Sequence, residues 1–265
     1  MIHTYYMNVT QFEDETLFRE KVSLLSPYRQ QKIAQQKQEA DKRRSLGAGL
    51  ALDYALRCYG QGLKERDMEY VSGEWGKPAF RDYPQIHFSL SHSGDYAMCS
   101  IGDRPVGNDI ERVRQGRLKV AERFFTAPER AFLYGEQSGD GEPVFLDRCT
   151  RLSRNACAAG GRECDSGKST ACDVQECEDD EITQRMFRIW TMKESFLKVT
   201  GRGMTLPLNA FSVIVEDERG IVRVEHSFDD AVYPMKEYGE IPGYRAAVCC
   251  QGDGEMAENM EPAAL

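Results

Sequence analysis

The chain has 265 residues, of which 41% are hydrophobic and 29% charged, and its formal net charge at pH 7 is −9. This composition is typical of a soluble globular protein, and its acidic balance argues against a sequence-independent nucleic-acid binder, which needs a broad basic face. No stretch approaches the roughly 20 apolar residues of a spanning helix, and the start lacks the basic and apolar runs of a secretory signal. We therefore predict a cytoplasmic protein that binds neither nucleic acid nor membrane.

The first half of the chain predicts one strand, one long helix and a strand pair. Apolar residues recur at helical spacing from Leu46 to Leu56, and two later segments alternate as paired strands do. A turn-forming run, Ser91 to Asp95, connects those two strands. The predicted elements are a strand at 2–9, a helix at 27–59 and strands at 86–90 and 96–101.

The second half predicts a strand, two short helices, a longer helix that carries Glu194, and three further strands that complete a sheet. Thr126 and Glu129 have the spacing of a capping box at the start of one short helix. The predicted positions are a strand at 105–111, a helix through 120–124, a helix opening at 126–129 and strands at 211–215, 222–226 and 244–249.

Two segments predict little order. Residues from about 135 to 181 are rich in Gly, Ser, Cys and charge, with weak periodicity, and indicate a poorly ordered insertion. Five of the nine cysteines lie there without any C-x-x-C pair, so incidental thiols in a solvated loop and a zinc site both stay open. We expect most cysteines to be reduced, and residues 251–265 to form a flexible acidic tail.

The two halves resemble each other. Each has a long helix, then strands, then a closing strand, and residues 95–99 echo residues 243–247. This pattern predicts an N-terminal lobe at 1–104 and a C-terminal lobe at 105–250, two similar α/β units that meet at a cleft.

Two motifs carry the chemistry. On a strand, Asp109 and Glu111 share a face, and on a helix Trp190, Glu194 and Lys198 line one side. Together they would supply three carboxylates and a lysine, which suits Mg²⁺ holding a phosphate beside an ammonium group. Taken singly, the motifs also fit a solvated strand edge and a surface ion pair on a helix.

Six blocks in this order resemble the 4′-phosphopantetheinyl transferases of the two-lobed, surfactin-synthetase-activating type. The blocks are 41–47 (Asp-Lys-Arg-Arg-Ser-Leu-Gly), 75–78 (Trp-Gly-Lys-Pro), 89–94 (Ser-Leu-Ser-His-Ser-Gly), 107–111 (Gly-Asn-Asp-Ile-Glu), 124–129 (Phe-Phe-Thr-Ala-Pro-Glu) and 190–198 followed by Gly-Arg-Gly at 201–203. The resemblance spans the chain except for the insertion and the tail.

The resemblance implies an α+β fold of two pseudo-symmetric α/β lobes with the ligand cleft between them. It also implies a monomeric transferase that moves the 4′-phosphopantetheine arm of coenzyme A to a serine of an apo acyl or peptidyl carrier protein. The other product would be 3′,5′-ADP. Carriers of fatty-acid, polyketide and nonribosomal peptide synthesis all stay open.

The resemblance also assigns roles to residues. Asp109, Glu111 and Glu194 would hold Mg²⁺, or Mn²⁺ in its place, and Lys198 would stabilise the transferred phosphate. The general base would be Glu194 or Glu129. Six N-terminal residues would bind coenzyme A, with the first three at its 3′-phosphate and adenine: Arg29, Lys32, Arg44, Lys77, Ser91 and His92.

Two features are particular to this chain. Arginines and a lysine crowd the segment after Glu111 and would receive an acidic carrier: Arg112, Arg114, Arg117, Lys119 and Arg123. Asn108 stands where the family usually has an aliphatic residue, and, if buried, needs hydrogen-bond partners.

Two other functions stay open. An acidic pair with a glutamate and a lysine also suits a Mg²⁺-dependent nuclease, although the net charge of −9 speaks against it. The chain could also be a non-catalytic module that binds coenzyme A or a carrier.

Overall fold

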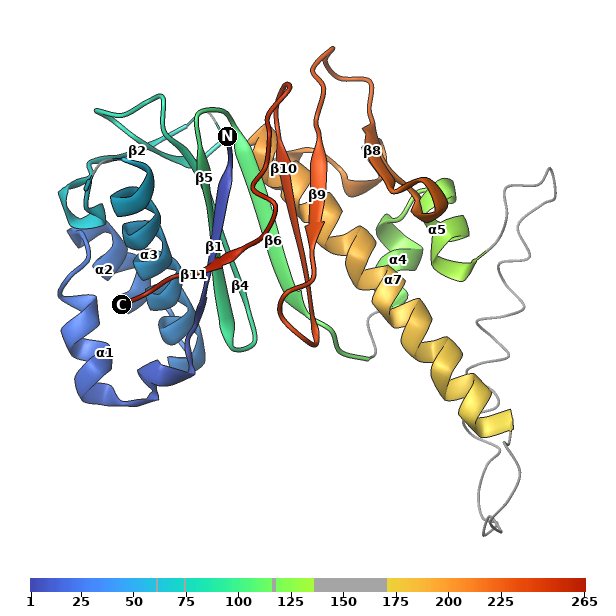
Figure 1. Ribbon diagram of the computed structural model, residues 1–265, viewed down its shortest axis with the longest axis horizontal. Coiled ribbons are helices and arrows are strands. Elements are labelled where there is room, and N and C mark those ends of the chain that lie inside the picture. The colour runs from blue at the N-terminus through green and yellow to red at the C-terminus, as the bar shows by residue number, and fades with distance from the viewer. Residues whose placement is uncertain (61, 74, 116–117, 136–170) are drawn as a thin grey trace, which may run out of the picture.

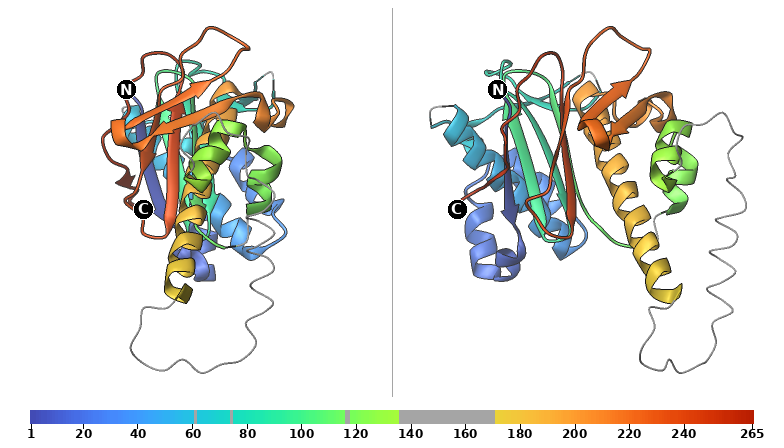
Figure 2. Two further views of the ribbon diagram at one scale, coloured as in Figure 1. Left: turned by 90° about the vertical axis from the view of Figure 1, so that its right-hand side faces the viewer. Right: turned by 45° about the vertical axis from the view of Figure 1, so that its right-hand side comes forward.

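The computed structural model describes residues 1–60, 62–73, 75–115, 118–135 and 171–265, with the backbone alone at 171–179, 204 and 218. The strands of two sheets gather in the middle of the molecule, and helices flank them on both sides (Figures 1 and 2). Within the described ranges, no helix is long and apolar enough to cross a membrane.

The N-terminal lobe is an antiparallel sheet covered by one long helix. Strands β1 (His3–Asn8), β5 (Tyr96–Gly102) and β4 (His87–Ser93) lie in that order, and helix α3 (Glu39–Tyr59) packs on them. A Cβ atom on Gly47 would lie 2.4 Å from Cγ1 of Val9, so a glycine is what lets this helix approach closely.

The C-terminal lobe repeats this arrangement. Strands β6 (Val106–Arg112), β10 (Tyr244–Cys250) and β9 (Met235–Tyr238) form an antiparallel sheet in that order, and α7 (Ala171–Thr200) packs on β6 and β10. In each lobe the first strand therefore pairs with the last, and the helix lies between them in sequence. The predicted pseudo-symmetry is confirmed for this order of strands and helix, since residues 96–99 and 244–247 of the echoed segments fall on the equivalent strands β5 and β10.

The remaining elements are short. They are η1 (Thr10–Glu13), α1 (Glu15–Val22), α2 (Pro27–Ala34), η2 (Glu65–Asp67), β2 (Tyr70–Ser72), β3 (Pro78–Phe80), α4 (Leu118–Phe124), α5 (Ala127–Tyr134), η3 (Gly203–Thr205), η4 (Leu208–Ala210), β7 (Ser212–Glu216), η5 (Asp217–Arg219), β8 (Ile221–Glu225) and β11 (Glu261–Pro262).

Several predicted boundaries were wrong. The helix expected at 27–59 is two helices, because the backbone is extended at Gln38 before α3 begins. The strands β7 and β8 form a separate hairpin rather than completing the main sheet, and β9 was missed. Helix α7 begins at Ala171, inside the segment expected to be irregular up to 181. The rest of that insertion, 136–170, lies outside the described residues, as do all five cysteine side chains of the possible zinc site.

The prediction of a flexible tail was also wrong. Beyond β10 the chain returns to the N-terminal lobe, where β11 pairs in parallel with β1 (Figure 1). The backbone N–H of Ala263 donates to the carbonyl of Tyr6 at 2.8 Å, and the side chain of Met260 is buried in an apolar cluster that also contains Ile110 of β6. The free edge of β1 and one apolar side chain thus order an otherwise polar segment.

Candidate functional site

The site begins with a close contact between β6 and α7. A Cβ atom on Gly107 would lie 2.0 Å from the carbonyl oxygen of Ser195 and 2.4 Å from the backbone nitrogen of Val199. Only hydrogen fits there, because both neighbours are backbone atoms. The contact brings the strand that carries Asp109 and Glu111 against the helix that carries Glu194 and Lys198.

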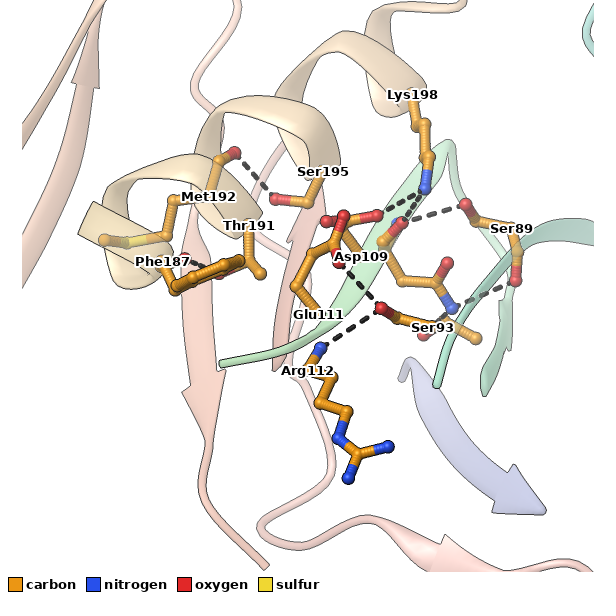
Figure 3. A network of polar contacts seen from close by, with 12 residues as sticks. Ser89, Ser93, Asp109, Glu111, Arg112, Phe187, Thr191, Met192, Ser195 and Lys198 are labelled. Atoms are coloured by element: carbon orange, nitrogen blue, oxygen red, sulfur yellow. Dashed lines mark hydrogen bonds and ion pairs between the residues drawn. The ribbon is translucent and has the colours of Figure 1, made fainter. Parts of the chain in front are cut away.

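Asp109 and Lys198 form the centre of the site. The Lys198 Nζ donates to Oδ1 of Asp109 at 2.8 Å (Figure 3). It also donates to the carbonyl of Asn108 at 2.9 Å. The other carboxylate oxygen of Asp109, Oδ2, is buried and has no partner. Burial raises the pKa of Asp109 to about 7, with Glu111 and Glu194 adding to the rise and Lys198 opposing it.

Glu111 and Glu194 complete the acidic group. Oε2 of Glu111 accepts a hydrogen bond from the hydroxyl of Ser93 at 2.7 Å (Figure 3). Burial raises the pKa of Glu194, and the Glu111 charge raises it further, while Lys198 lowers it. In the part of the chain that the structure describes, no three His, Cys, Asp or Glu side chains form a ready metal site. The nearest positive charge to Asp109 is instead the Lys198 ammonium.

The donor set nevertheless fits a hard cation. It consists of carboxylate oxygens alone, and one of them is buried without a partner, which is costly unless something binds there. A cation at Asp109 would also offset the charges of Glu111 and Glu194, both of which raise the pKa of Asp109.

Glu129, the other candidate base, lies elsewhere. Its side chain is fully buried and forms an ion pair with Lys193. One carboxylate oxygen also accepts from the backbone of Val213 at 2.7 Å, and the other accepts from the backbone of Thr126 at 2.7 Å. Both oxygens are therefore engaged in the core of the C-terminal lobe. This geometry favours Glu194 over Glu129 as the base.

A cavity of about 410 Å³ lies between the lobes beside this centre. One wall comes from the N-terminal lobe and includes three basic side chains, and the other comes from the end of α7 and the turn after it. The lining residues include Tyr28, Arg29, Lys32, Lys77, Ser89, Leu90, Leu197, Lys198 and Gly201. Three of the six residues predicted to bind coenzyme A line it, together with Lys198.

The three basic residues that the N-terminal lobe contributes to the cavity differ in their burial and in their hydrogen-bond partners. Arg29 donates to the carbonyl of Ser45 at 3.0 Å, and its Nε is buried without a partner. Lys32 is exposed, with its Nζ 5.6 Å from the ring centroid of Tyr28. Lys77 donates to the carbonyls of Val106 and Lys198, at 2.6 and 2.7 Å. Burial, and then the Lys198 charge, lower the pKa of Lys77 to about 8.

The other three predicted ligands form a group near the β4–β5 turn. The hydroxyl of Ser91 is buried without a partner. Desolvation lowers the pKa of His92, and the charges of Arg44 and Lys198 lower it further. Arg44 donates to the carbonyl of Gly94 at 3.3 Å and to Asp41 at 2.5 Å. These residues do not line the cavity, but His92 and Lys198 are close enough to interact electrostatically.

Sequence reasoning missed how the lobes join. Strands β4 and β6 belong to different sheets, and side chains connect their facing edges, which we call the interlobe seam. The hydroxyl of Ser89 accepts from the backbone N–H of Asn108 at 3.0 Å, and that of Ser93 accepts from Arg112 at 3.1 Å. Ser89, Ser91 and Ser93 alternate along one strand, and this spacing was the available signal.

A family model described as the 4′-phosphopantetheinyl transferase superfamily matches residues 105–249, more than half of the chain. The 4′-phosphopantetheinyl transferase Sfp of Bacillus subtilis (strain 168) is 29% identical over 251 residues, which cover 94% of this chain and 91% of that protein. The 4′-phosphopantetheinyl transferase ffp of Bacillus subtilis is 31% identical over 187 residues, covering 71% of this chain and 65% of the relative.

Among solved structures, a holo-(acyl-carrier-protein) synthase from Bacillus anthracis in complex with CoA (3′,5′-ADP) gives a TM-score of 0.34 at 17% identity. That similarity covers 57% of this chain and 97% of the other.

Proposed function

This chain belongs to the 4′-phosphopantetheinyl transferase superfamily, and we propose that it moves the 4′-phosphopantetheine arm of coenzyme A to a serine of an apo acyl or peptidyl carrier protein. The serine oxygen would bond to the β-phosphorus, the bond from that phosphorus to the bridging oxygen would break, and 3′,5′-ADP would leave. The observation that supports this most is the interlobe cavity, which has basic residues on one wall and Lys198, paired with Asp109, on the other.

The acidic centre supports a metal-dependent reaction. Asp109, Glu111 and Glu194 would hold Mg²⁺, or Mn²⁺ in its place, and the ion would neutralise the diphosphate. Glu194 would accept the proton of the serine hydroxyl, because it belongs to the acidic centre, whereas both carboxylate oxygens of Glu129 are engaged in the core. Lys198 would stabilise the negative charge on the transferred phosphoryl group. A nuclease finds less support, because the net charge of −9 would repel a nucleic acid.

The basic wall supports binding of the nucleotide part of coenzyme A. Arg29, Lys32 and Lys77 would meet its phosphates from within the cavity, and Arg44, Ser91 and His92 would do so from the β4–β5 turn. The unpartnered Arg29 Nε and Ser91 hydroxyl are buried donors that an anion could satisfy. We therefore propose that residues 1–104 hold coenzyme A and residues 105–250 carry the reacting groups. A monomer suffices, because both walls of the cavity come from one chain.

The carrier would dock beside the acidic centre. Arg112, at the end of β6, is exposed, as are Arg114, Lys119 and Arg123, while Arg117 lies outside the described residues. This local positive charge would attract an acidic carrier to a chain whose net charge is −9. Docking there would place the carrier serine near Glu111 and Glu194. We propose that both partners meet in the cytoplasm.

Mass spectrometry of a panel of apo carriers, each incubated with coenzyme A, Mg²⁺ and the protein, tests the proposal. We expect at least one carrier to gain one phosphopantetheine mass. The variant Glu194→Gln should lose this activity, and Glu122→Gln, at an exposed glutamate on α4, should keep it. Coenzyme A binding without transfer to any carrier would indicate the non-catalytic module, and cleavage of DNA would indicate the nuclease.

A further inference from the structure

We propose that Asn108 is a positioning residue that keeps the coenzyme A-binding edge of the N-terminal lobe in register with the reacting groups of the C-terminal lobe. This inference rests on the proposed function. It concerns a side chain that touches neither the cavity nor the acidic group.

The Asn108 side chain joins three strands. Its amide nitrogen donates to the carbonyl of Ser89 on β4 at 3.1 Å and to the hydroxyl of Ser100 on β5 at 3.0 Å. The Ser100 hydroxyl continues the network to Thr4 on β1, at 3.0 Å. One side chain of the C-terminal lobe is therefore held by all three main strands of the N-terminal sheet.

The backbone of Asn108 meets the reacting groups. Its carbonyl accepts from the Lys198 Nζ at 2.9 Å, and the next residue is Asp109. On the other side of the seam, Ser89 lines the cavity, and Ser91 and His92 follow it along β4. The distance between the two sets of groups therefore depends on how β4 and β6 are aligned at Asn108.

The burial of Asn108 argues against a packing role alone. The residue is 0% exposed, so water cannot replace its hydrogen bonds, and its Oδ1 atom is buried without a partner. An aliphatic side chain would avoid that unsatisfied acceptor. What an aliphatic side chain cannot do is donate to two strands of the other lobe at once.

The lobes would remain intact without this side chain. Gly107 holds β6 against the backbone of α7, so Asp109 and Lys198 stay together whatever side chain follows the glycine. Arg29 and Lys32 lie on α2, and neither takes part in the hydrogen bonds of the Asn108 side chain. Replacing Asn108 should therefore misalign the lobes while leaving most of each lobe's own site in place.

The test compares Asn108→Val with Thr4→Val, which removes a buried hydroxyl of the same network that makes no hydrogen bond to Asn108 itself. For both variants we would measure the thermal midpoint, the Kd for coenzyme A and the kcat for one apo carrier. For Asn108→Val we expect kcat to fall by about tenfold to a hundredfold, because small misplacements of reacting groups have effects of this size. Its Kd for coenzyme A should stay within about threefold of wild type. For Thr4→Val the midpoint should fall, with kcat within about twofold of wild type.

Ser100→Ala covers the case in which Asn108→Val does not fold. This variant keeps the hydrogen bond from Asn108 to the Ser89 carbonyl and removes the one to the Ser100 hydroxyl. We therefore expect kcat to fall by about threefold, with the Kd for coenzyme A unchanged. A wild-type kcat in Asn108→Val overturns the inference. The inference is also overturned if Thr4→Val lowers both kcat and the thermal midpoint as much as Asn108→Val does. If Asn108→Val does not fold, a wild-type kcat in Ser100→Ala overturns it. Each of these results leaves the proposed function standing if the wild type transfers the arm, whereas an inactive wild type overturns both.

Discussion

Lys77 changes its charge close to neutral pH. Its pKa is lowered to about 8, mainly by burial, so the free protein carries an ammonium there below pH 8 and a neutral amine above it. Only the charged form attracts a phosphate. We therefore expect the Kd for coenzyme A to be lowest below pH 8 and to rise above it by up to about tenfold per pH unit. Isothermal titration calorimetry between pH 6.5 and 9.5 would measure this, with buffers of different ionisation enthalpy reporting the proton taken up.

Two arginine variants distinguish the effect of Lys77 on this pH dependence from that of Lys32. Lys77→Arg keeps its charge over the whole range, so its profile should be flat. Lys32→Arg, at an exposed lysine of the same cavity, should keep the wild-type profile. A Lys77→Arg profile that still weakens above pH 8 would show that another group governs the dependence.

Asp109 and Glu194 are expected to serve the reaction more than binding. Asp109→Ala and Glu194→Ala should each lower kcat by about a hundredfold or more, since each would remove a proposed metal ligand and Glu194 is also the proposed base. Binding of coenzyme A should persist in part through Arg29, Lys32 and Lys77. Single-turnover transfer with saturating coenzyme A measures the rate of the reaction, and calorimetry measures the binding of coenzyme A. Wild-type turnover in either variant would refute the metal assignment.

The site depends on the close contact between strand β6 and helix α7. In Gly107→Ala the new methyl group would collide with backbone atoms of Ser195 and Val199, which cannot rotate away. We expect a loss of about 1–3 kcal/mol in the free energy of unfolding, measured by urea denaturation, and a large fall in activity. Gly239→Ala is the matched control, because nothing lies within 4 Å of its new Cβ atom. Equal midpoints for the two variants would contradict a tight strand–helix contact.

The segment after β6 should act on the carrier alone. Reversing the charges of Arg114 and Lys119 to Glu should raise the KM for an acidic carrier several-fold, because both side chains are exposed in the segment that follows Glu111. The KM for coenzyme A should stay near its wild-type value. Arg219→Glu, an exposed change elsewhere in the lobe, serves as the control. Steady-state kinetics with each substrate varied in turn decides, and equal effects on both KM values would count against this docking segment.

Local patterns predicted the elements that build the site, but not their partners. Strand alternation located β4 and β5, and the spacing of Trp190, Glu194 and Lys198 indicated the helix that became α7. Glu129 was given a possible catalytic role because its motif alone does not show that Lys193, far along the chain, points to it inside the core. The interlobe seam was missed because its hydrogen bonds join serines to the backbone of a strand in another sheet.

The whole molecule is held together by its last residues as well as by the seam. The carbonyl of Ala257 accepts from the Tyr238 hydroxyl at 2.8 Å and from Lys236 at 3.0 Å, both on β9, while the Ala257 N–H donates to the carbonyl of Ile2 at 2.8 Å. One residue thus links the outer strand of the C-terminal sheet to the start of the N-terminal lobe. The order of this segment depends on a distant free strand edge, which explains why its acidic composition was misleading.

Removing residues 255–265 should therefore destabilise the protein as a whole. The deletion exposes the edge of β1 and empties the site of Met260, whose side chain is 5% exposed. Burial of a methionine of this kind stabilises by about 1.5–3 kcal/mol, so we expect at least that loss in the free energy of unfolding. Met260→Ala should reproduce most of it, and Glu258→Ala, at an exposed position, should not. Denaturation curves for the three variants measure the effect. A truncated protein as stable as wild type would mean that the tail lies on the lobes without holding them.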